Sequence, residues 1–133
     1  MIVVDTNVIA YFVIPGDETE LAEAVWAKDS TWAAPSLWRS EMRNLLSLYV
    51  KREKFDLLDA NEFIADATNL LEGNEFGVES HCVLELASRS GCSAYDCEFV
   101  SIAERLGVPL VTSDKKLLAA FPDIAVSMKA FAA

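Results

Sequence analysis

Blocks of apolar residues separated by polar ones predict a chain in which short strands alternate with helices. Apolar runs predict buried strands at residues 2–4, 31–34, 110–112 and 124–127. Apolar residues spaced three or four positions apart predict helices at residues 18–28, 36–52, 60–72, 81–89 and 94–106, and a shorter helix from Lys115. This alternation predicts a three-layer α/β/α fold around a small central parallel sheet.

Residues that commonly cap helices accompany these predicted boundaries. The polar residues 5–7 directly follow the first strand and can start a helical turn. Ser36 and Asp59 are expected to cap the helices that follow them. Gly91 and Gly107 are expected to end the helices that precede them.

Length and composition predict one domain over residues 1–133. The chain is 53% hydrophobic and 24% charged, which is enough apolar material for a core. Its longest uncharged stretch, residues 6–16, contains a proline and is shorter than the ~20 apolar residues of a membrane span. The first basic residue is Lys28, which argues against a secretory signal. We therefore expect a cytoplasmic protein with no membrane segment.

The charge of the chain is strongly acidic. It has 21 acidic and 11 basic side chains, a formal net charge of −10. Because Lys and Arg drive nonspecific binding to phosphates, this excess argues against a general affinity for nucleic acid. Acids that converge on one place can instead hold a divalent cation, and the cation can then bind phosphate. The positions of the acids therefore matter more than their number.

Cysteine adds little chemistry. Cys82, Cys92 and Cys97 are odd in number and have no CxxC spacing. Neither a disulfide framework nor a zinc site is indicated, and buried free thiols are expected.

Two aspartates follow predicted strands directly. Asp5 comes after the apolar residues 2–4, and Asp114 comes after the run that begins at Leu110. Ligands of open parallel sheets bind outside the carboxyl ends of the strands, so both side chains are expected in one crevice. Each aspartate could instead simply cap the next helix.

Two further acids lie on apolar helix stripes. Glu41 shares its stripe with Leu37, Leu45 and Leu48, and Asp96 precedes apolar residues at i+3, i+4 and i+7. A buried carboxylate must be paired with a cation, hydrogen-bonded or bound to a metal. For Asp96, near a helix start, capping is the competing explanation.

Side-chain cations near these acids are few. Arg39 and Arg43 flank Glu41 at i−2 and i+2, which points them away from it. Buried salt bridges from Arg89, Arg105 or Lys129 are the alternative to a metal. Two carboxylates ~4 Å apart repel by ~4 kcal/mol at an effective dielectric of ~20, so four acids in one site need a positive charge. Oxygen ligands alone favour Mg²⁺ or Mn²⁺, without His81 or the cysteines.

At these residues the chain resembles PIN-domain ribonucleases, and most closely the VapC-type toxins of type II toxin–antitoxin pairs. The matching segments lie in order along nearly the whole chain, and they are Val3-Val4-Asp5-Thr6-Asn7, Glu41, Ala94-Tyr95-Asp96 and Gly107-Val108-Pro109-Leu110-Val111-Thr112-Ser113-Asp114. Each motif alone is weak, whereas the ordered set is specific.

The resemblance implies a PIN-like fold, in which helices wrap a small parallel sheet, with four acids around the metal. The implied catalytic residues and metal ligands are Asp5, Glu41, Asp96 and Asp114, around one or two Mg²⁺ or Mn²⁺ ions. The implied supporting polar residues, which orient the acids or the water, are Asn7 and Thr112, together with Thr6. Some family members carry another acid shortly after the last aspartate, where this chain has residues 115–117, Lys-Lys-Leu.

The resemblance also implies a reaction and partners. The reaction is metal-assisted hydrolysis of RNA phosphodiester bonds. Family members commonly form homodimers, and an antitoxin typically places a basic side chain in the active-site groove. Arg39, Arg43 and Lys115 lie beside the acids and are candidate contacts for RNA or antitoxin, the alternative being a solvated basic face. The tryptophans, Trp26, Trp32 and Trp38, are expected in the core or an oligomer interface, with stacking on a base as the alternative.

Other functional classes fit the sequence less well. A haloacid-dehalogenase-type phosphotransferase usually needs a second acid two residues after the first, where this chain has Asn7. The paired early acids of a response-regulator receiver and the GxxxxGK loop of a nucleotide triphosphate site are absent from the sequence. The alternatives that stay open are a PIN-fold RNA-processing nuclease outside any toxin pair and a noncatalytic binding module.

Overall fold

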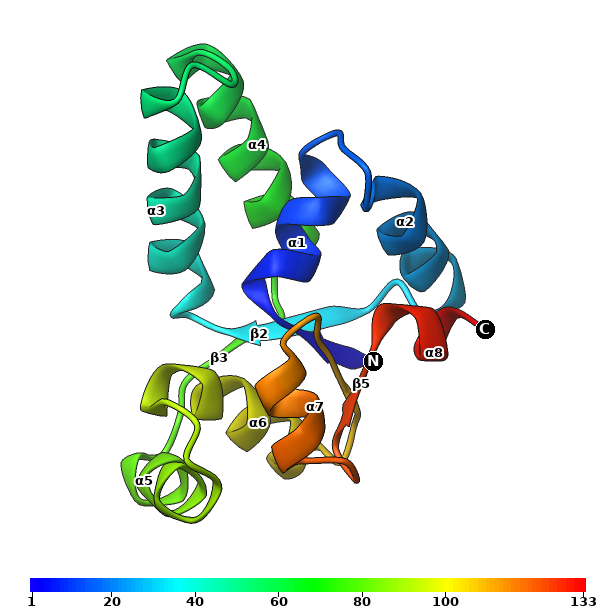
Figure 1. Cartoon of the computed structure of the whole chain (residues 1–133), viewed down its shortest axis with the longest axis vertical. Helices are drawn as coiled ribbons and strands as arrows, with labels where there is room; N and C mark the ends of the chain where they lie inside the picture. The colour runs from blue at the N-terminus through cyan, green and yellow to red at the C-terminus, as the bar shows by residue number, and fades with distance from the viewer.

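The computed structural model describes all 133 residues, as a parallel sheet with helices on both faces (Figure 1). The strands are β1 (Ile2–Val4), β2 (Trp32–Pro35), β3 (Glu75–Phe76), β4 (Leu110–Val111) and β5 (Ala125–Val126). They lie in the order β3-β2-β1-β4-β5, and every neighbouring pair is parallel. The predicted α/β/α fold with a small parallel sheet is confirmed.

Helices form the two outer layers. On one side of the sheet lie α1 (Thr6–Val13), α2 (Thr19–Lys28), α3 (Trp38–Lys51) and α4 (Leu57–Leu70). On the other side lie α5 (Ser80–Ser90), α6 (Ala94–Leu106) and α7 (Lys115–Ala120), while the C-terminal α8 (Met128–Ala132) packs against α2. None of these helices has the length and apolar character that crossing a bilayer would require.

The strand order places a crevice at the centre of the sheet. The chain moves outward from β1 through β2 to β3, and then returns to the other side of β1 for β4 and β5. β1 and β4 are therefore neighbours, with Val4 beside Val111 in the register. Connections leave these two strands in opposite directions, so a ligand crevice is expected outside their carboxyl ends.

The core explains why the strands are so apolar. A parallel strand covered on both faces reads as a continuous hydrophobic run, and all three residues of β1 are buried. Trp32 and Trp38 have no exposed surface, and Trp26 packs against Phe12 and Trp32 at ring-centroid distances of 5.2 and 5.5 Å. The expected packing role of the tryptophans is confirmed.

The cysteines are all free. Cys92 and Cys97 are buried, as expected, whereas Cys82 is partly exposed on α5.

Two helix starts differ from the predictions. α4 is capped by Asp56, and Asp59 is instead the third residue of a capping box: the Asp59 N–H donates to Asp56 Oδ1 (2.9 Å), and the Asp56 N–H donates back to Asp59 Oδ2 (3.4 Å). α3 begins at Trp38 without a side-chain cap, because Ser36 lies in the preceding turn. The predicted helix ends are confirmed at Gly91 and Gly107, whose positive φ angles of 74° and 66° suit glycine.

The sequence did not predict β3 or α8. β3 has two residues, one of them the polar Glu75, and it exists through its pairing with β2. α8 has five residues and is capped by Ser127, whose hydroxyl accepts from the Ala130 N–H (3.1 Å). Neither segment is long enough for a periodic pattern.

Candidate active site

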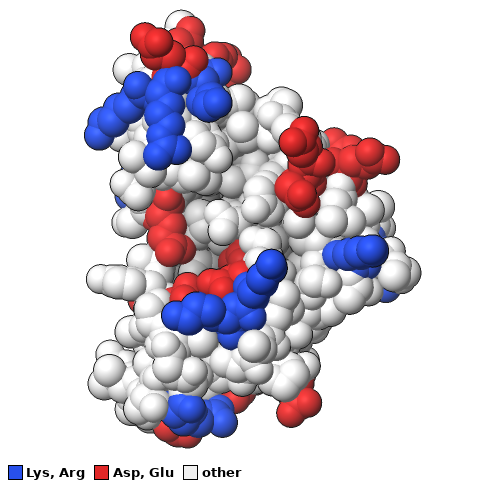
Figure 2. All heavy atoms as spheres, in the orientation of Figure 1, with Lys and Arg blue, Asp and Glu red and all other residues white.

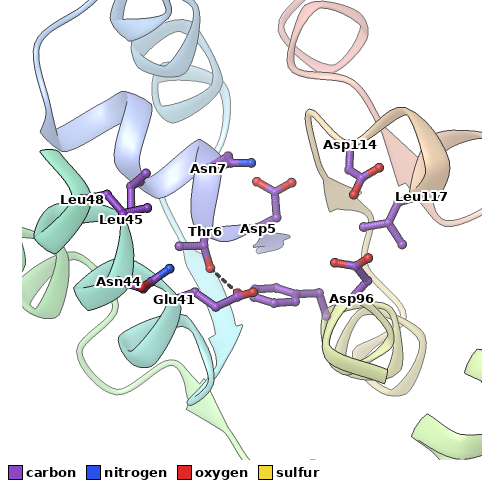
Figure 3. Close-up of a pocket in the computed structure, with 11 residues that line it drawn as sticks. Asp5, Thr6, Asn7, Glu41, Asn44, Leu45, Leu48, Asp96, Asp114 and Leu117 are labelled. Carbon is purple, nitrogen blue, oxygen red and sulfur yellow. Dashed lines mark hydrogen bonds between the residues drawn. The ribbon is translucent and has the colours of Figure 1, made fainter. Parts of the chain in front are cut away.

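The four acids that the sequence singles out line one cleft at the carboxyl edge of the sheet. The cleft has a volume of about 270 Å³, and its acidic lining residues are Asp5, Glu41, Asp96 and Asp114. Figure 3 shows Asp5, Asp96 and Asp114 pointing into a common space, with Glu41 reaching it from α3. Asp5 follows β1, Asp114 follows β4, and Asp96 lies in the first turn of α6. Four separate segments therefore supply the acids.

Asp5 and Asp114 also cap the helices that follow them. The Val8 N–H donates to Asp5 Oδ1 (2.9 Å), and the Lys116 N–H donates to Asp114 Oδ1 (2.8 Å). The sequence offered two interpretations of each aspartate, as a helix cap or as an acid of the cleft. Both interpretations are correct for Asp5 and for Asp114. The other oxygen of Asp114 accepts no hydrogen bond from the protein.

Thr112 links these two aspartates. It has no exposed surface, and its hydroxyl donates to Asp5 Oδ2 and accepts from the Asp114 N–H (3.0 Å). The Ser113 N–H also donates to Asp5 Oδ2 (3.2 Å). Both oxygens of Asp5 are therefore held by neighbours, and Thr112 orients this carboxylate.

Glu41 lies on a different face of α3 from the one predicted. The stripe from Leu37 to Leu48 that contains Glu41 was expected to face the core, and this expectation is wrong. The core-facing residues of α3 are Trp38, Met42 and Leu46, whereas Leu45 and Leu48 line the cleft and Leu48 is 37% exposed. An apolar stripe cannot by itself distinguish a core from a partly apolar cleft, because both favour the same side chains.

Thr6 holds the Glu41 carboxylate across the cleft. The Thr6 hydroxyl donates to Glu41 Oε1 (2.7 Å), which joins the first turn of α1 to α3 (Figure 3). Asn7 also lines the cleft, with an exposed side chain that makes no hydrogen bond within the protein. Its orienting role stays a prediction.

Asp96 is not the cap of its helix. Ser93 caps α6, and its hydroxyl accepts from the Asp96 N–H (3.1 Å). The Asp96 carboxylate accepts no hydrogen bond from the protein and lies at the cleft wall beside Phe99. Capping therefore does not explain this acid.

Burial and like charges raise the pKa of two of these carboxyls. Burial is the main cause of the raised pKa of Asp5; the hydrogen bonds from Thr112, Val8 and Ser113 oppose it, and the charge of Asp114 adds to it. Burial likewise raises the pKa of Glu41, against the Thr6 hydrogen bond and with contributions from Asp96, Asp5 and Glu98. At both positions, burial and neighbouring acids outweigh the hydrogen bonds that favour the charged carboxylate.

No side-chain cation pairs with any of the four acids. The ion pairs of the chain lie elsewhere, namely Met1–Asp29, Arg39–Glu75, His81–Glu79 and Arg89–Glu104. Arg89 thus has another partner, and neither Arg105 nor Lys129 forms an ion pair. The buried-salt-bridge alternative is wrong for this cleft.

The donor set fits a hard divalent cation that keeps part of its water shell. The four acids offer only carboxylate oxygens as ligand atoms, which suits Mg²⁺ or Mn²⁺. No three of the four acids bring their oxygens within 4.8 Å of one another. Three possible ligand atoms come that close at the start of α5, namely a carboxylate oxygen of Glu79, an imidazole nitrogen of His81 and the thiol sulfur of Cys82, which are exposed or partly exposed. Mg²⁺ is usually bound through one or two carboxylates, with waters and substrate phosphates as the other ligands, so spaced acids are compatible with it.

Glu98 is an acid near the cleft that the sequence did not indicate. Burial raises its pKa, and its charge contributes to the raised pKa of Glu41. It lies two positions after Asp96 on α6, a spacing that ordinarily points side chains to different helix faces. The apolar cleft residues Phe99 and Leu117 were likewise not predicted as part of the site.

The predicted basic contacts differ in availability. Arg39 donates two hydrogen bonds to Glu75 (2.7 and 2.8 Å) and lies over the Trp38 ring, so its charge already has a partner. Arg43 and Lys115 are exposed. Figure 2 shows Lys and Arg side chains over the end of α3 and beside the start of α7, on either side of the hollow that contains the acids. Contact of these residues with RNA or antitoxin stays a prediction.

Comparison with known proteins agrees with this geometry. The PIN domain family model matches residues 2–123. Ribonuclease VapC3 of Pyrobaculum aerophilum is 30% identical over 131 residues, which span 91% of this chain and 95% of that protein. The crystal structure of PAE2754 from Pyrobaculum aerophilum has a TM-score of 0.76 at 20% identity, over 98% of this chain and 92% of that one. At this identity the structural likeness supports the fold alone.

Proposed function

Because this chain belongs to the PIN domain family and is of the VapC type, we propose that it is an endoribonuclease that depends on Mg²⁺ or Mn²⁺. One observation carries the proposal. Asp5, Glu41, Asp96 and Asp114 reach a single cleft from separate segments, and no cationic side chain neutralises them. A protein that only needed a folded core would gain nothing from this arrangement, since each additional acid raises the electrostatic energy of the others.

In the proposed reaction, the acids would hold one or two divalent ions. Asp5 and Glu41 would be the fixed ligands, because hydrogen bonds from Thr112 and Thr6 set the positions of their oxygens. Asp96 offers a carboxylate with no protein donor attached to it. A bound ion would supply a water of lowered pKa and stabilise the charge that develops on the phosphodiester.

The charge of the cleft also makes the approach of RNA depend on bound cations. Four carboxylates repel an RNA backbone, so the chain's own residues exclude the substrate until cations offset their charge. Two divalent ions would still leave the chain with about −6, from the formal −10 plus four. We therefore expect weak, metal-dependent and site-selective binding of RNA in place of a general coating of nucleic acid.

We propose a toxin–antitoxin role for the chain, with an antitoxin whose basic side chain enters the acidic cleft. The relative named Ribonuclease VapC3 supports this role, and the uncompensated acids fit a basic partner. A homodimer and a cytoplasmic location belong to the same proposal. A neighbouring gene for a small DNA-binding protein with a basic tail would favour the toxin role over RNA processing.

The decisive experiment is cleavage of RNA by the purified chain. We expect cleavage with Mg²⁺ or Mn²⁺ and none after EDTA, with activity restored by excess metal. Cleavage that persists in EDTA would contradict the metal assignment, and absence of cleavage with either metal would favour the noncatalytic binding module. Mapping new RNA 5′ ends after induced expression in cells would then identify the target.

A further inference from the structure

A second and larger cavity adjoins the acidic cleft. Its volume is about 610 Å³, against about 270 Å³ for the cleft, and Asn7 and Leu45 line both. Cavities of this size are typical of sites for small molecules or for single groups of a polymer. We refer to this second cavity as the aromatic groove, after the rings of Tyr11, Tyr49 and Phe55 in its lining.

Helices α1 and α3 line both the acidic cleft and the aromatic groove. Asn7 and Tyr11 are four residues apart on α1, and Leu45 and Tyr49 are four residues apart on α3. In each pair the first residue lines both cavities and the second lines the groove. Because four helical residues advance by ~6 Å, the tyrosines lie about one helical turn beyond the shared residues. A polymer with one unit at the acids would extend its next unit between these walls.

Aromatic packing fixes two of the three rings of the groove, those of Tyr49 and Phe55. The Tyr49 and Phe55 rings pack edge to face with centroids 5.8 Å apart, and Phe55 packs in turn against Phe63 at 5.1 Å. Tyr11 and Tyr49 are half-buried, so part of each ring remains available to the groove. Exposed aromatic faces stack on the bases of single-stranded nucleic acids.

The opposite rim is a fixed loop that carries acids. The Thr19 hydroxyl accepts from the Gly16 N–H (2.9 Å) and donates to the Ile14 carbonyl (3.2 Å), which closes the turn between α1 and α2. Asp17 and Glu18 lie in this turn, and Lys54 is the one cation in the groove lining. Figure 2 shows a mostly uncharged hollow between acids over this loop and basic residues over the end of α3. An excess of acids disfavours a phosphate in the groove and tolerates a neutral base.

We propose that the aromatic groove holds an unpaired RNA base adjacent to the bond that is cut, stacked between Tyr11 and Tyr49. This inference rests on the proposed ribonuclease function. A base can enter the groove only if it is splayed out of a helix. The groove then selects the structure of the cleavage site, while the acids perform the reaction.

The kinetic test compares Tyr49→Leu with Tyr49→Phe. Loss of the ring should raise KM for a single-stranded oligoribonucleotide about tenfold with kcat within about twofold, since a stacked base contributes ~1 to 3 kcal/mol and ~1.4 kcal/mol is tenfold. Tyr49→Phe, which keeps the ring, should match the wild-type chain. Tyr11→Leu tests the opposite wall, and melting curves identify any variant that fails to fold.

A binding readout separates the failure of this inference from that of the proposed function. With the wild-type chain and Mn²⁺, 2-aminopurine is placed at each position in turn of a cleavage-resistant phosphorothioate oligonucleotide. We expect fluorescence quenching at a position next to the cleavage site, lost on adding Tyr49→Leu and kept with Tyr49→Phe. If the wild-type chain cleaves RNA but neither KM nor quenching changes when Tyr49 or Tyr11 is replaced, the proposed base subsite is wrong. A protein segment would then be the occupant to test in the groove. If no metal-dependent cleavage occurs at all, the ribonuclease proposal itself fails.

Discussion

Two glutamates near α3 illustrate opposite uses of a carboxylate. Glu75 on β3 accepts hydrogen bonds from Arg39 and from the Trp38 indole N–H (2.8 Å), and the Arg39 hydrogen bonds hold its pKa below the usual range. Glu41 has a hydroxyl donor and other acids around it, and burial raises its pKa. Glu75 thus joins α3 to the edge of the sheet, whereas Glu41 remains uncompensated in the cleft. The absence of a cationic partner, more than burial, distinguishes the candidate site.

The largest expected effect is on catalysis, and only substitutions of the cleft acids should cause it. Asp96→Asn should lower metal-dependent RNA cleavage by about a thousandfold, because a metal ligand contributes several kcal/mol to the transition state. Because the Asp96 side chain makes no hydrogen bond, the Asp96→Asn variant should keep the fold of the wild-type chain, which circular dichroism can check. Glu75→Gln is the matched control and should retain activity within a few-fold. Equal losses in the two variants would remove the distinction between the regions.

Metal binding should stabilise the wild-type chain through the cleft. With Mn²⁺ at about 100 times its dissociation constant, the free energy of unfolding should rise by ~2.7 kcal/mol. The gain should shrink in Glu41→Gln and persist in Glu75→Gln, as thermal melts with and without EDTA would show. A gain that survives in Asp96→Asn and Glu41→Gln alike would place the ion outside the cleft, with the cluster of Glu79, His81 and Cys82 as the first alternative to examine.

Removing the two side chains should change metal-free stability in opposite directions. Glu75→Leu deprives the fully buried Trp38 of the acceptor for its indole N–H, which costs about 1 to 2 kcal/mol. Glu41→Gln keeps an oxygen for Thr6 and removes a charge that its neighbours repel, so it should stabilise the protein by a smaller amount. Urea denaturation at neutral pH measures both changes. Destabilisation by Glu41→Gln would indicate that the cleft acids are compensated after all.

The smallest expected effect is a difference in pH dependence. The pKa of Glu41 is raised in the folded chain, so as pH rises from its ordinary 4.5 through the folded value the protein loses stability. The pKa of Glu75 is lowered, so its contribution is present above 4.5 and is lost as pH falls through the folded value. Metal-free Glu41→Gln should therefore exceed the wild-type chain in stability above this window and equal it below. A constant difference at all pH values would assign the effect to packing.

The sequence predicted most of the sheet and all four acids of the cleft, because these depend on local patterns. β1, β2, β4 and β5 are apolar runs, and Asp5 and Asp114 are positioned by the ends of strands alone. The helical spacing of Glu41 with neighbouring leucines correctly indicated a shared face of α3. The prediction that this face lies in the core was wrong, since α3 buries Trp38, Met42 and Leu46 instead.

What the sequence could not predict depends on contacts between distant segments. β3 is defined by its pairing with β2, and the Thr6–Glu41 and Thr112–Asp5 hydrogen bonds join residues 35 and 107 positions apart. The aromatic groove likewise needs α1, α3 and the residues after α3 to be placed together before its rings become neighbours. No single helix or strand carries a pattern for these features.

The double use of Asp5 and Asp114 as helix caps and cleft acids has a consequence for how such a chain can change over generations. A lineage that no longer needs the activity can replace Glu41 or Asp96 without removing the start of any helix. Replacing Asp5 or Asp114 would also remove the cap of α1 or α7. Descendants that have lost the activity should therefore lose the acids of α3 and α6 first and retain the two strand-end aspartates, so an intact pair of these aspartates is weak evidence that a related chain is still active.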